Sequence, residues 1–341
     1  MKQIIRQAIG IDISEKDFHA CHYVLDLRGR AIRKGKVRVF KNTIPGFRSF
    51  LVWVEKIRSA CSAELFLVME ATGVYHEQLA YFAHEQHQVV KILLPNTVKS
   101  FAKSLNSLSK TDTIDAQVMA QMGVERSLRT WQPMSPLMQE LKTLSRQRQA
   151  FIKQRTVLSN QLHADMKRAR PVKNNIKRDK AMIAQYNKYI DQIEKEMAEL
   201  LKEDQPLKVN IKRLCTVPGV GFITAATLLA ETDGLVLFNS ESQLISYCGY
   251  DVKRHDSGTS VRGKTSISKS GNSHIRGALY MPSMSSMQLE GPFRDCYYRV
   301  VDRTGHGKMG LVAVQRKMLK VMFACHKKQE DYDPSYHANR A

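Results

Sequence analysis

Two apolar runs that each carry a carboxylate most constrain how this chain can fold. The segment Ile9-Gly-Ile-Asp-Ile-Ser14 has the composition of a short buried β-strand, and Asp12 lies among its apolar neighbours. A second run, Leu65-Phe-Leu-Val-Met-Glu70, ends at an acid. A lone carboxylate is costly to bury unless it is paired, hydrogen-bonded or bound to a cation. Asp12 alone could simply cap the following turn, so the other acids decide between these interpretations.

Two further acids, Asp112 and Asp115, stand where a helix is predicted to begin, in Lys110-Thr-Asp-Thr-Ile-Asp115. At positions i and i+3 they project from one face of that helix. Clustered carboxylates repel one another unless a hard divalent cation neutralises them, and Mg²⁺ prefers such oxygen ligands. The four acids, at strand ends and at one helix start, therefore predict a two-metal phosphoryl-transfer site.

The charge balance indicates a polyanionic partner. The chain of 341 residues has a formal net charge of +21, and the excess is spread along its length. For a globular chain this points most often to nucleic acid. A membrane-surface protein could share the balance, but the sequence has neither an apolar run of about 18 residues nor a signal-peptide pattern. We therefore expect a cytoplasmic protein with no membrane partner. Its six cysteines are dispersed without a CxxC pair, which favours reduced thiols over a zinc site or disulfides.

Residues 1–130 have the pattern of an α/β domain. Apolar alternation and turn residues predict strands over 7–13, 18–26, 34–41, 64–69 and 89–94, a helix from Pro45, and a helix over 75–86. Three antiparallel strands followed by alternating helix and strand form the ribonuclease-H-like arrangement of many metal-dependent nucleases and transposases. That step is an analogy of fold. It places Asp12 on the first strand and Glu70 on the fourth.

Residues 131–204 predict two long helices. From Leu137 the apolar residues follow alternating spacings of 4 and 3, a heptad seam that also carries Arg148 and Arg155, and a second such run follows Pro171. The two helices are expected to pack as an antiparallel hairpin or against a second subunit. Between residues 140 and 180 there are 12 Lys and Arg but 3 Asp and Glu. A solvated coiled-coil face would explain most of these charges singly, whereas their density favours contact with phosphates.

Residues 205–341 begin with a helix-hairpin-helix pattern. In Val217-Pro-Gly-Val-Gly221, Gly219 and Gly221 permit a tight turn, and backbone N–H groups at the following helix start can hold a phosphate without reading sequence. A purely structural corner between two helices would look similar. Contact with the DNA backbone is favoured, because the pattern is more specific than a lone pair of glycines.

A basic loop rich in glycine and serine follows, and it presents Ser257 before Gly258. A serine hydroxyl becomes a useful nucleophile only if a base, a metal or local positive charge lowers the cost of its deprotonation. As a flexible surface loop the segment would be unremarkable. The nearby basic residues predicted to bind phosphate are Lys253, Arg254, Arg262, Lys264, Lys269 and Arg276.

Taken together, the motifs resemble a known family, the DEDD-type insertion-sequence transposases related to the Piv DNA invertase, which are regarded as bridge-RNA-guided serine recombinases. The resemblance covers nearly the whole chain. It rests on Ile9-Gly-Ile-Asp12, Met69-Glu-Ala-Thr-Gly-Val-Tyr75, Lys110-Thr-Asp-Thr-Ile-Asp-Ala116, Val217-Pro-Gly-Val-Gly221, Ser257-Gly and Lys269-Ser-Gly-Asn-Ser-His-Ile-Arg-Gly-Ala-Leu279. One local departure is Tyr250-Asp-Val252, where relatives often carry Leu-Thr-Pro.

The resemblance implies a catalytic site and a set of partners. The family's acidic tetrad, which binds Mg²⁺, falls on Asp12, Glu70, Asp112 and Asp115, and its nucleophile falls on Ser257. The implied domains are a RuvC-like domain (1–130), an α-helical coiled coil (131–204) and a mainly α transposase domain (205–341). The implied partners are target DNA, donor DNA and a structured guide RNA, the bridge RNA.

Three functions follow from this reading, one of them favoured. We expect an RNA-guided recombinase that works through a phosphoserine intermediate, assembled as a dimer of dimers, because the heptad runs offer an assembly surface and recombination must hold several DNA ends. The first alternative is a metal-dependent hydrolytic junction resolvase or nuclease, in which the acids activate water and Ser257 only contacts phosphate. The second is a nucleic-acid-binding protein without catalytic activity.

Overall fold

The structure is a computed structural model that describes residues 4–71, 73–106, 111–202, 204–253, 256–257, 261–262 and 266–334. The chain divides into two compact units, Met1–Pro133 and Met134–Ala341. Each unit has hydrophobic clusters of its own. In the part of the chain that is described, none of the helices has the length and apolar character needed to cross a membrane.

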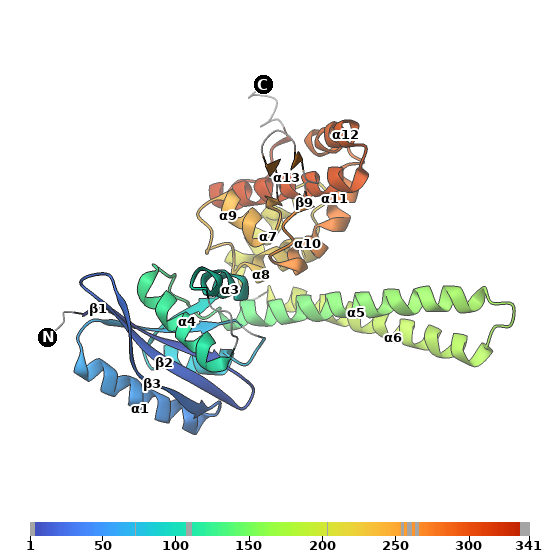
Figure 1. Cartoon of the computed structure of the whole chain (residues 1–341). Helices are drawn as coiled ribbons and strands as arrows, with labels where there is room; N and C mark the ends of the chain where they lie inside the picture. Colours follow the sequence, from blue (N-terminus) through green and yellow to red (C-terminus); the bar gives the residue numbers. More distant parts are fainter. Residues whose placement is uncertain are drawn as a thin grey trace. The chain divides into compact units, whose positions relative to one another are not determined.

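The first unit is a five-stranded sheet with helices on both faces (Figure 1). Its elements are β1 (Ile4–Ile13), β2 (Asp17–Asp26), β3 (Ala31–Lys41), α1 (Ile44–Ala60), β4 (Glu64–Glu70), α2 (Glu77–Glu85), β5 (Val89–Leu93), α3 (Pro95–Ser104) and α4 (Asp112–Glu125). The strand order is β3-β2-β1-β4-β5. Strands β1, β2 and β3 pair antiparallel, whereas β4 pairs parallel with both β1 and β5. The predicted α/β domain is thereby confirmed.

One helix of this unit was not predicted from the sequence. Pro95, which directly follows the predicted strand over 89–94, occupies the first turn of α3. Proline suits that position because its fixed φ matches a helix and its missing N–H would have no helical partner there.

Alternation along the strands divides the core into two layers. Ile9, Ile11 and Phe18 face one side of the sheet, where residues of α1 and α2 pack against them. Ala8 and Val68 face the other side, where they meet α3 and α4. In Figure 1, α1 and α4 accordingly lie against opposite faces of the sheet. Successive side chains of a strand point to opposite faces, so alternate residues of β1 meet α1 and α2 on one side and α3 and α4 on the other.

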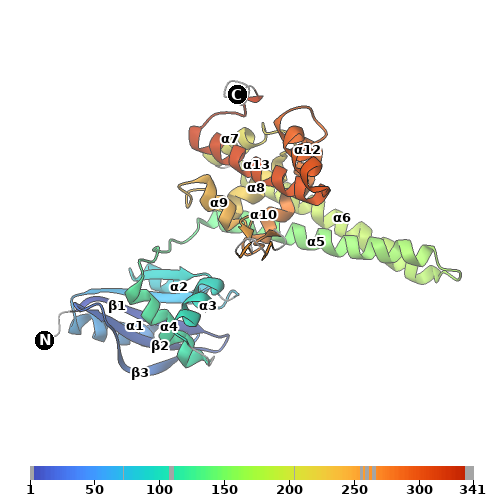
Figure 2. The ribbon, with the colours of Figure 1, turned by 45° about the horizontal axis from the view of Figure 1, so that its top comes forward.

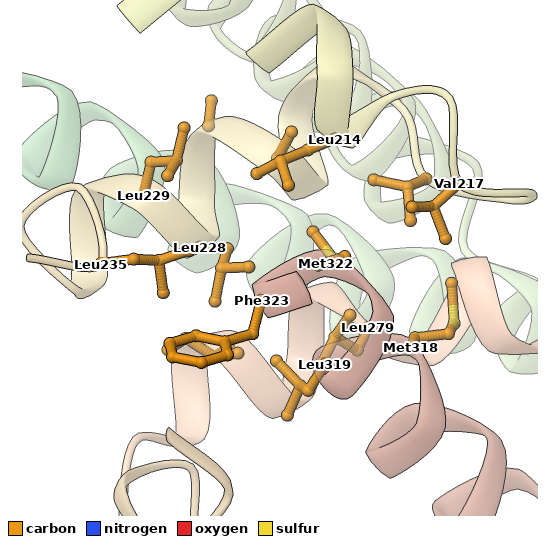
Figure 3. Packing of buried hydrophobic residues seen from close by; sticks show 14 of the residues in the cluster. Leu214, Val217, Leu228, Leu229, Leu235, Leu279, Met318, Leu319, Met322 and Phe323 are labelled. Atoms are coloured by element: carbon orange, nitrogen blue, oxygen red, sulfur yellow. The ribbon is translucent and has the colours of Figure 1, made fainter. Parts of the chain in front are cut away.

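The second unit is mainly helical. Its elements are α5 (Pro136–Met166), α6 (Lys173–Leu200), α7 (Gln205–Leu214), α8 (Phe222–Glu231), α9 (Glu241–Tyr247), β6 (Val252–Lys253), β7 (Asp256–Ser257), β8 (Val261–Arg262), β9 (Ser266–Ile267), α10 (Ser273–Ala278), α11 (Tyr280–Ser286), α12 (Pro292–Thr304) and α13 (Gly307–Lys328). Its core is centred on α8 and α13, and Figure 3 shows Leu228 and Leu229 of α8 with Met318, Leu319 and Met322 of α13.

Helices α5 and α6 form an antiparallel hairpin. Arg148 binds Glu194 at 2.7 Å, Arg155 donates to Asn187 at 2.8 Å, and the ring of Phe151 contacts Tyr186 and Tyr189. From Arg148 to Arg155 of α5, the partner on α6 changes from Glu194 to Asn187, so the two helices run in opposite directions. Both views show the two helices side by side, extending away from the other helices of their unit (Figures 1 and 2). Of the two predicted alternatives, the hairpin within one chain is therefore present.

The base of this hairpin belongs to the helical core. Met138 and Leu141 of α5, with Ile193 and Met197 of α6, are buried in the same cluster as α8 and α13. Ser145 of α5 shares a hydrogen bond of 2.8 Å with Thr227 of α8. The hairpin is thus fixed at its base by the elements that carry the rest of the unit.

Candidate active site

Asp12 and Glu70 come from neighbouring parallel strands. The register of β1 and β4 pairs Gly10 with Val68 and Ile11 with Met69. The next residue of each strand is therefore Asp12 and Glu70, at the same edge of the sheet. Both residues are half-buried.

The two side chains also belong to the same face. Ala8 and Gly10, four and two positions before Asp12, face α4, and Phe66 and Val68 stand in the same relation to Glu70. Because strand side chains alternate, Asp12 and Glu70 share that face. The carboxylates are therefore directed to the side of the sheet that α4 covers.

Close packing of α4 on β1 depends on Gly10. A Cβ added there would lie 2.1 Å from the Ala116 carbonyl oxygen and 2.2 Å from the Ala120 backbone nitrogen. One turn further along, a Cβ on Gly123 would lie 2.7 Å from the Cβ of Ala8. A glycine inside a strand commonly marks such a close approach of another backbone. This approach fixes the first turn of α4 near the end of β1.

That first turn carries the other two acids. Helix α4 begins at Asp112, and the Thr111 hydroxyl caps it by accepting from the Ile114 backbone N–H at 3.3 Å. Asp112 Oδ2 lies 3.9 Å from His19 Nδ1, and His19 is the residue opposite Asp12 in the antiparallel pair of β1 and β2. Asp115 follows one helical turn later and is half-buried. The four predicted acids therefore occupy one edge of the sheet.

A fifth side chain ties the two acid-bearing strand ends together. The Asn42 amide donates to the Ser14 carbonyl oxygen at 2.9 Å and to the Tyr75 carbonyl oxygen at 3.3 Å. Ser14 follows β1 and Tyr75 lies beyond β4. Neither Asn42 nor Gly10 was identified as functional from the sequence. For Gly10 a signal existed, a glycine within an apolar strand, whereas an asparagine after a strand carries none.

The acids have the donor chemistry of a divalent-metal site. Within the described residues, no three Asp, Glu, His or Cys side chains are already gathered closely enough to hold a metal ion. Four carboxylates from three elements that meet at one edge nevertheless fit a hard cation such as Mg²⁺, which takes oxygen ligands. Burial raises the pKa of the neighbouring Cys21 thiol to about 11, although Arg33 opposes the rise. The Cys21 thiol is therefore neutral at neutral pH.

Ser257 lies in the second unit, within a short β-hairpin. Strand β6 pairs antiparallel with β9, and beyond them β7, which contains Ser257, pairs with β8, which contains Arg262. The sequence predicted a loop here, because two-residue strands in a Gly/Ser-rich segment give no periodic signal. The structure describes only the backbone of Ser257 and Arg262, and Arg254 and Lys264 lie outside the described residues.

The two chain ends of this hairpin meet at a pair of glycines. A Cβ on Gly271 would lie 2.5 Å from the Gly249 backbone nitrogen, and Gly249 adopts a φ of +72°. Arg276 donates to the Cys248 carbonyl oxygen at 2.7 Å, so it supports this junction. Lys253 and Lys269 are exposed. Binding of nucleic acid by these three basic residues stays a prediction.

The predicted helix-hairpin-helix segment forms helix α7, a short turn and helix α8. Val217 and Val220 anchor the turn in the core, while Gly219 and Gly221 are exposed. Gly219 has a φ of +84°, and a Cβ there would lie 2.5 Å from the Pro282 carbonyl oxygen. Gly221 is the N-cap residue of α8 and has open space in the direction of an added Cβ. The turn thus packs on one side and is open on the other.

Comparison with known proteins identifies both units. A family model described as a transposase of the DEDD, IS110 type matches residues 9–171, and one described as the transposase IS116/IS110/IS902 family matches residues 211–298. The pilin gene-inverting protein of Moraxella bovis is 29% identical over 331 residues, which cover 96% of this chain and 98% of that protein. The transposase for insertion sequence element IS1328 of Yersinia enterocolitica is 24% identical over 307 residues, covering 82% and 84%.

A solved structure resembles part of the chain. RuvC of T. thermophilus in complex with a Holliday junction substrate covers 37% of this chain and 99% of its own, at 14% identity and a TM-score of 0.27. A likeness this weak carries no argument. The family matches span both units and agree with relatives that align over most of the chain. The chain therefore belongs to the DEDD-type IS110 family of DNA transposases.

Proposed function

We propose that this transposase cuts a DNA strand through Ser257, holds the cut end as a phosphoserine ester and rejoins it to a new partner. The acids Asp12, Glu70, Asp112 and Asp115 form its metal-binding site. The observation that supports this most is the convergence of the four acids on one edge of a sheet, from β1, β4 and the first turn of α4. The ribonuclease-H-like order of strands and helices in this unit agrees with a nuclease-type site.

The bonds exchanged in this reaction balance without an external energy source. The Ser257 oxygen forms a new bond to phosphorus, and the bond from phosphorus to one deoxyribose oxygen breaks. The serine proton is lost, and a proton reaches the released sugar oxygen, which leaves as a hydroxyl. In rejoining, a hydroxyl of another strand attacks the phosphoserine and the serine regains its proton. Each step exchanges one phosphate ester for another, so no ATP is needed.

The acids need a cation to serve this chemistry. Mg²⁺ bound by them would orient the scissile phosphate and stabilise the charge that develops on it. The contribution of the protein is placement. Gly10 brings α4 onto β1, Thr111 caps that helix, and Asn42 holds the two strand ends. These contacts fix the strand ends and the helix start that carry the four acids.

DNA is held mainly through its backbone in this proposal. The positive charge of the chain is spread widely, and no recognisable base-reading motif stands out in the sequence. Exposed Lys253 and Lys269, and the open side of the turn at Gly221, are proposed phosphate contacts. Sequence choice is then delegated to a structured guide RNA whose loops pair with target and donor DNA.

A trapping experiment tests the proposal. The protein is incubated in Mg²⁺ with a plasmid that carries its coding region and flanking DNA, together with RNA transcribed from those flanks, and the reaction is stopped with detergent. We expect cut DNA covalently attached to protein. Cut DNA with free ends and no attached protein would contradict the proposal and favour the hydrolytic resolvase. A footprint on the DNA without any cutting would favour the binding protein.

The guide is tested separately. Purified protein is offered a library of random DNA with and without the RNA transcribed from its flanking region. We expect selection of a defined target sequence only when the RNA is present. Equal selection by the protein alone would contradict RNA guidance while leaving the strand chemistry untouched.

A further inference from the structure

Glu231, the last residue of α8, is a carboxylate with no exposed side-chain surface. It accepts two parallel hydrogen bonds from Arg146 of α5, at 2.6 and 2.9 Å, and a third from the Asn272 amide at 2.7 Å. A buried carboxylate requires such partners, and the bidentate guanidinium pair is among the strongest available. Three separate segments of the second unit therefore meet at one side chain.

Asn272 uses its remaining groups to fix the chain around it. Its backbone N–H donates to the Tyr247 carbonyl oxygen at 2.8 Å, and its side-chain oxygen accepts from the N–H groups of His274 and Ile275, which caps α10. The Tyr247 hydroxyl donates to the Glu231 carbonyl oxygen at 2.9 Å. The position of Asn272 is thus set on both sides by hydrogen bonds.

This residue directly follows the root of the hairpin that contains Ser257. Gly271 precedes Asn272 and packs against Gly249, and the Lys269 N–H donates to the Gly249 carbonyl oxygen at 3.0 Å. The two ends of the hairpin over residues 252–267 therefore leave the helical core beside Asn272.

We propose that Asn272 and Glu231 are positioning residues for Ser257. Their contact, completed by Arg146, holds the root of the serine hairpin against α8 and α5. This inference rests on the proposed role of Ser257 as nucleophile. It adds that the helical hairpin α5–α6 is coupled to the serine, since Arg146 lies on α5 five residues beyond Leu141, which is buried in the core. Neither residue touches the reacting phosphate in this proposal.

The network is built to keep Glu231 charged. Burial alone would raise the pKa of Glu231, but the hydrogen bonds from Arg146 and Asn272 and the Arg146 charge outweigh it, so the pKa lies below its ordinary value. A carboxylate at residue 272 would therefore face an ionised carboxylate at residue 231. Exchanging the hydrogen-bond donor at residue 272 with the acceptor at residue 231 therefore tests this contact directly.

Three variants of the full-length protein make the test: Asn272→Asp, Glu231→Gln and the double variant. In Asn272→Asp, two carboxylates face each other. In the double variant, the amide at residue 231 can donate a hydrogen bond to the carboxylate at residue 272. Amide hydrogen exchange is measured over residues 252–267, with α13 as the internal reference. We expect Asn272→Asp to speed exchange in that segment by about tenfold or more, and the double variant to reverse most of this change. Exposed Asn239→Asp, with the same charge change, should leave it as in wild type.

The catalytic readout separates positioning from substrate binding. At saturating plasmid DNA, we expect Asn272→Asp to lower the rate of strand cleavage about 100-fold, as a small misplacement of a reacting group does. The dissociation constant for DNA should stay within about threefold, because Asn272→Asp alters none of the proposed phosphate contacts at Lys253, Lys269 and Gly221. The double variant should recover cleavage in parallel with slowed exchange.

Two results would overturn the inference. One is unchanged exchange over residues 252–267 in Asn272→Asp, and the other is a double variant no better than its parents. If Asn272→Asp does not fold, Asn272→Ser decides in its place, since serine still caps α10 but cannot reach Glu231. Hydrogen exchange is measured without DNA, so it tests the contact of Asn272 with Glu231 separately from catalysis. If the wild-type protein forms no serine adduct, the proposed function fails, but the exchange rates still show whether this contact holds the hairpin.

Discussion

Asp12 and Glu70 reach the edge of the sheet from neighbouring strands, and Asp112 and Asp115 reach it from a helix. Ligands of one metal site act as a unit, so loss of any one should cost nearly as much as loss of several. We expect each neutral variant, Asp→Asn or Glu70→Gln, to lower strand cleavage by about 1,000-fold while DNA affinity is retained. Rates of plasmid nicking and DNA affinity, measured side by side, check this.

Asp17→Asn is the matched control for the acids. Asp17 begins β2, near the same edge, and forms an ion pair with Lys41 at 3.8 Å. Its neutralisation changes the net charge equally but removes no proposed ligand, so cleavage should persist. Substantial Mg²⁺-dependent cleavage by more than one of the four acid variants would show that the assignment of the metal ligands is wrong.

A second prediction for a single residue concerns Gly10. A methyl group at Gly10 would meet backbone atoms of Ala116 and Ala120, which cannot rotate away, so α4 itself must move. We expect Gly10→Ala to lower the free energy of unfolding by about 2 kcal/mol and to impair cleavage more than stability alone explains. Urea unfolding and nicking rates measure the two effects.

The control for Gly10 is Gly277→Ala in α10, where an added Cβ has no neighbour within 4 Å. Alanine favours a helix over glycine, so this change should be neutral or stabilising by up to about 1 kcal/mol. A Gly10→Ala protein as stable and as active as wild type would contradict the close packing of α4 on β1.

At the scale of elements, the attachment of β1 to β2 contains a pH-sensitive group. His22 of β2 is buried, and its Nε2 lies 3.1 Å from the Gln7 side-chain oxygen, while the Gln7 amide donates to the Cys61 and Ala63 carbonyl oxygens. Burial, assisted by the charge of Lys34, lowers the pKa of His22 from 6.5 to about 4. His22 is therefore neutral in the folded first unit at neutral pH.

The sign of the pH dependence follows from that shift. Between pH 6.5 and about 4 the unfolded chain binds a proton that the folded chain does not, so stability falls as the pH drops through this window. The loss should reach about 3 kcal/mol and be complete below the folded pKa. His22→Gln should remove most of it. Both tryptophans, Trp53 and Trp131, lie in the first unit, so their fluorescence during urea unfolding reports it alone. Equal pH slopes for wild type and variant would contradict the assignment.

Periodicity explains which elements could be predicted from the sequence. The strands β1 to β5 and the helices α1, α5 and α6 have apolar patterns long enough to be read locally. Helix α3 follows directly after a strand, so Pro95 both ends the predicted strand and begins a helix that no apolar pattern had indicated. Strands β6 to β9 have two residues each, too few for any alternation. The β6–β9 ladder forms where the chain on either side is held together at Gly249 and Gly271.

The candidate site, too, could be predicted only in part from local patterns in the sequence. The four acids could be grouped from the sequence because carboxylates at the ends of apolar runs, and a pair at one helix start, call for a partner such as a cation. The residues that place them act through distant parts of the chain, Gly10 through Ala116 and Asn42 through Tyr75. Of the two, only Gly10 had a signal in the sequence, as a glycine within an apolar strand. The contact of Glu231 with Arg146 likewise joins positions 85 residues apart. These contacts exist only in the folded chain.

At the scale of the whole molecule, the acids belong to the first unit and Ser257 to the second. We expect the active oligomer, a dimer of dimers, to combine Ser257 of one subunit with the acids of another. Such an arrangement would prevent cleavage before assembly is complete. Mixing Ser257→Ala subunits with Asp12→Asn subunits should then restore part of the activity, because some interfaces would pair two intact halves.

The control for this mixture uses two variants with the same half damaged. Asp12→Asn mixed with Asp115→Asn should stay inactive, since no interface then has an intact set of acids. If the first mixture also stays inactive although mixed oligomers form, the acids and the serine act within one subunit. That outcome would refute the shared site and leave the phosphoserine chemistry in place.

The most direct test of the central claim is to identify the atom to which cut DNA is joined. Protein–DNA adducts trapped from the plasmid reaction are digested with protease and nuclease, and the modified peptide is sequenced by mass spectrometry. We predict a nucleotide on Ser257 in wild type, no adduct in Ser257→Ala, and none in Asp12→Asn, which retains the serine but lacks a metal ligand. A nucleotide on another residue, such as Ser260, or an adduct that persists in Ser257→Ala, would show that Ser257 is not the nucleophile.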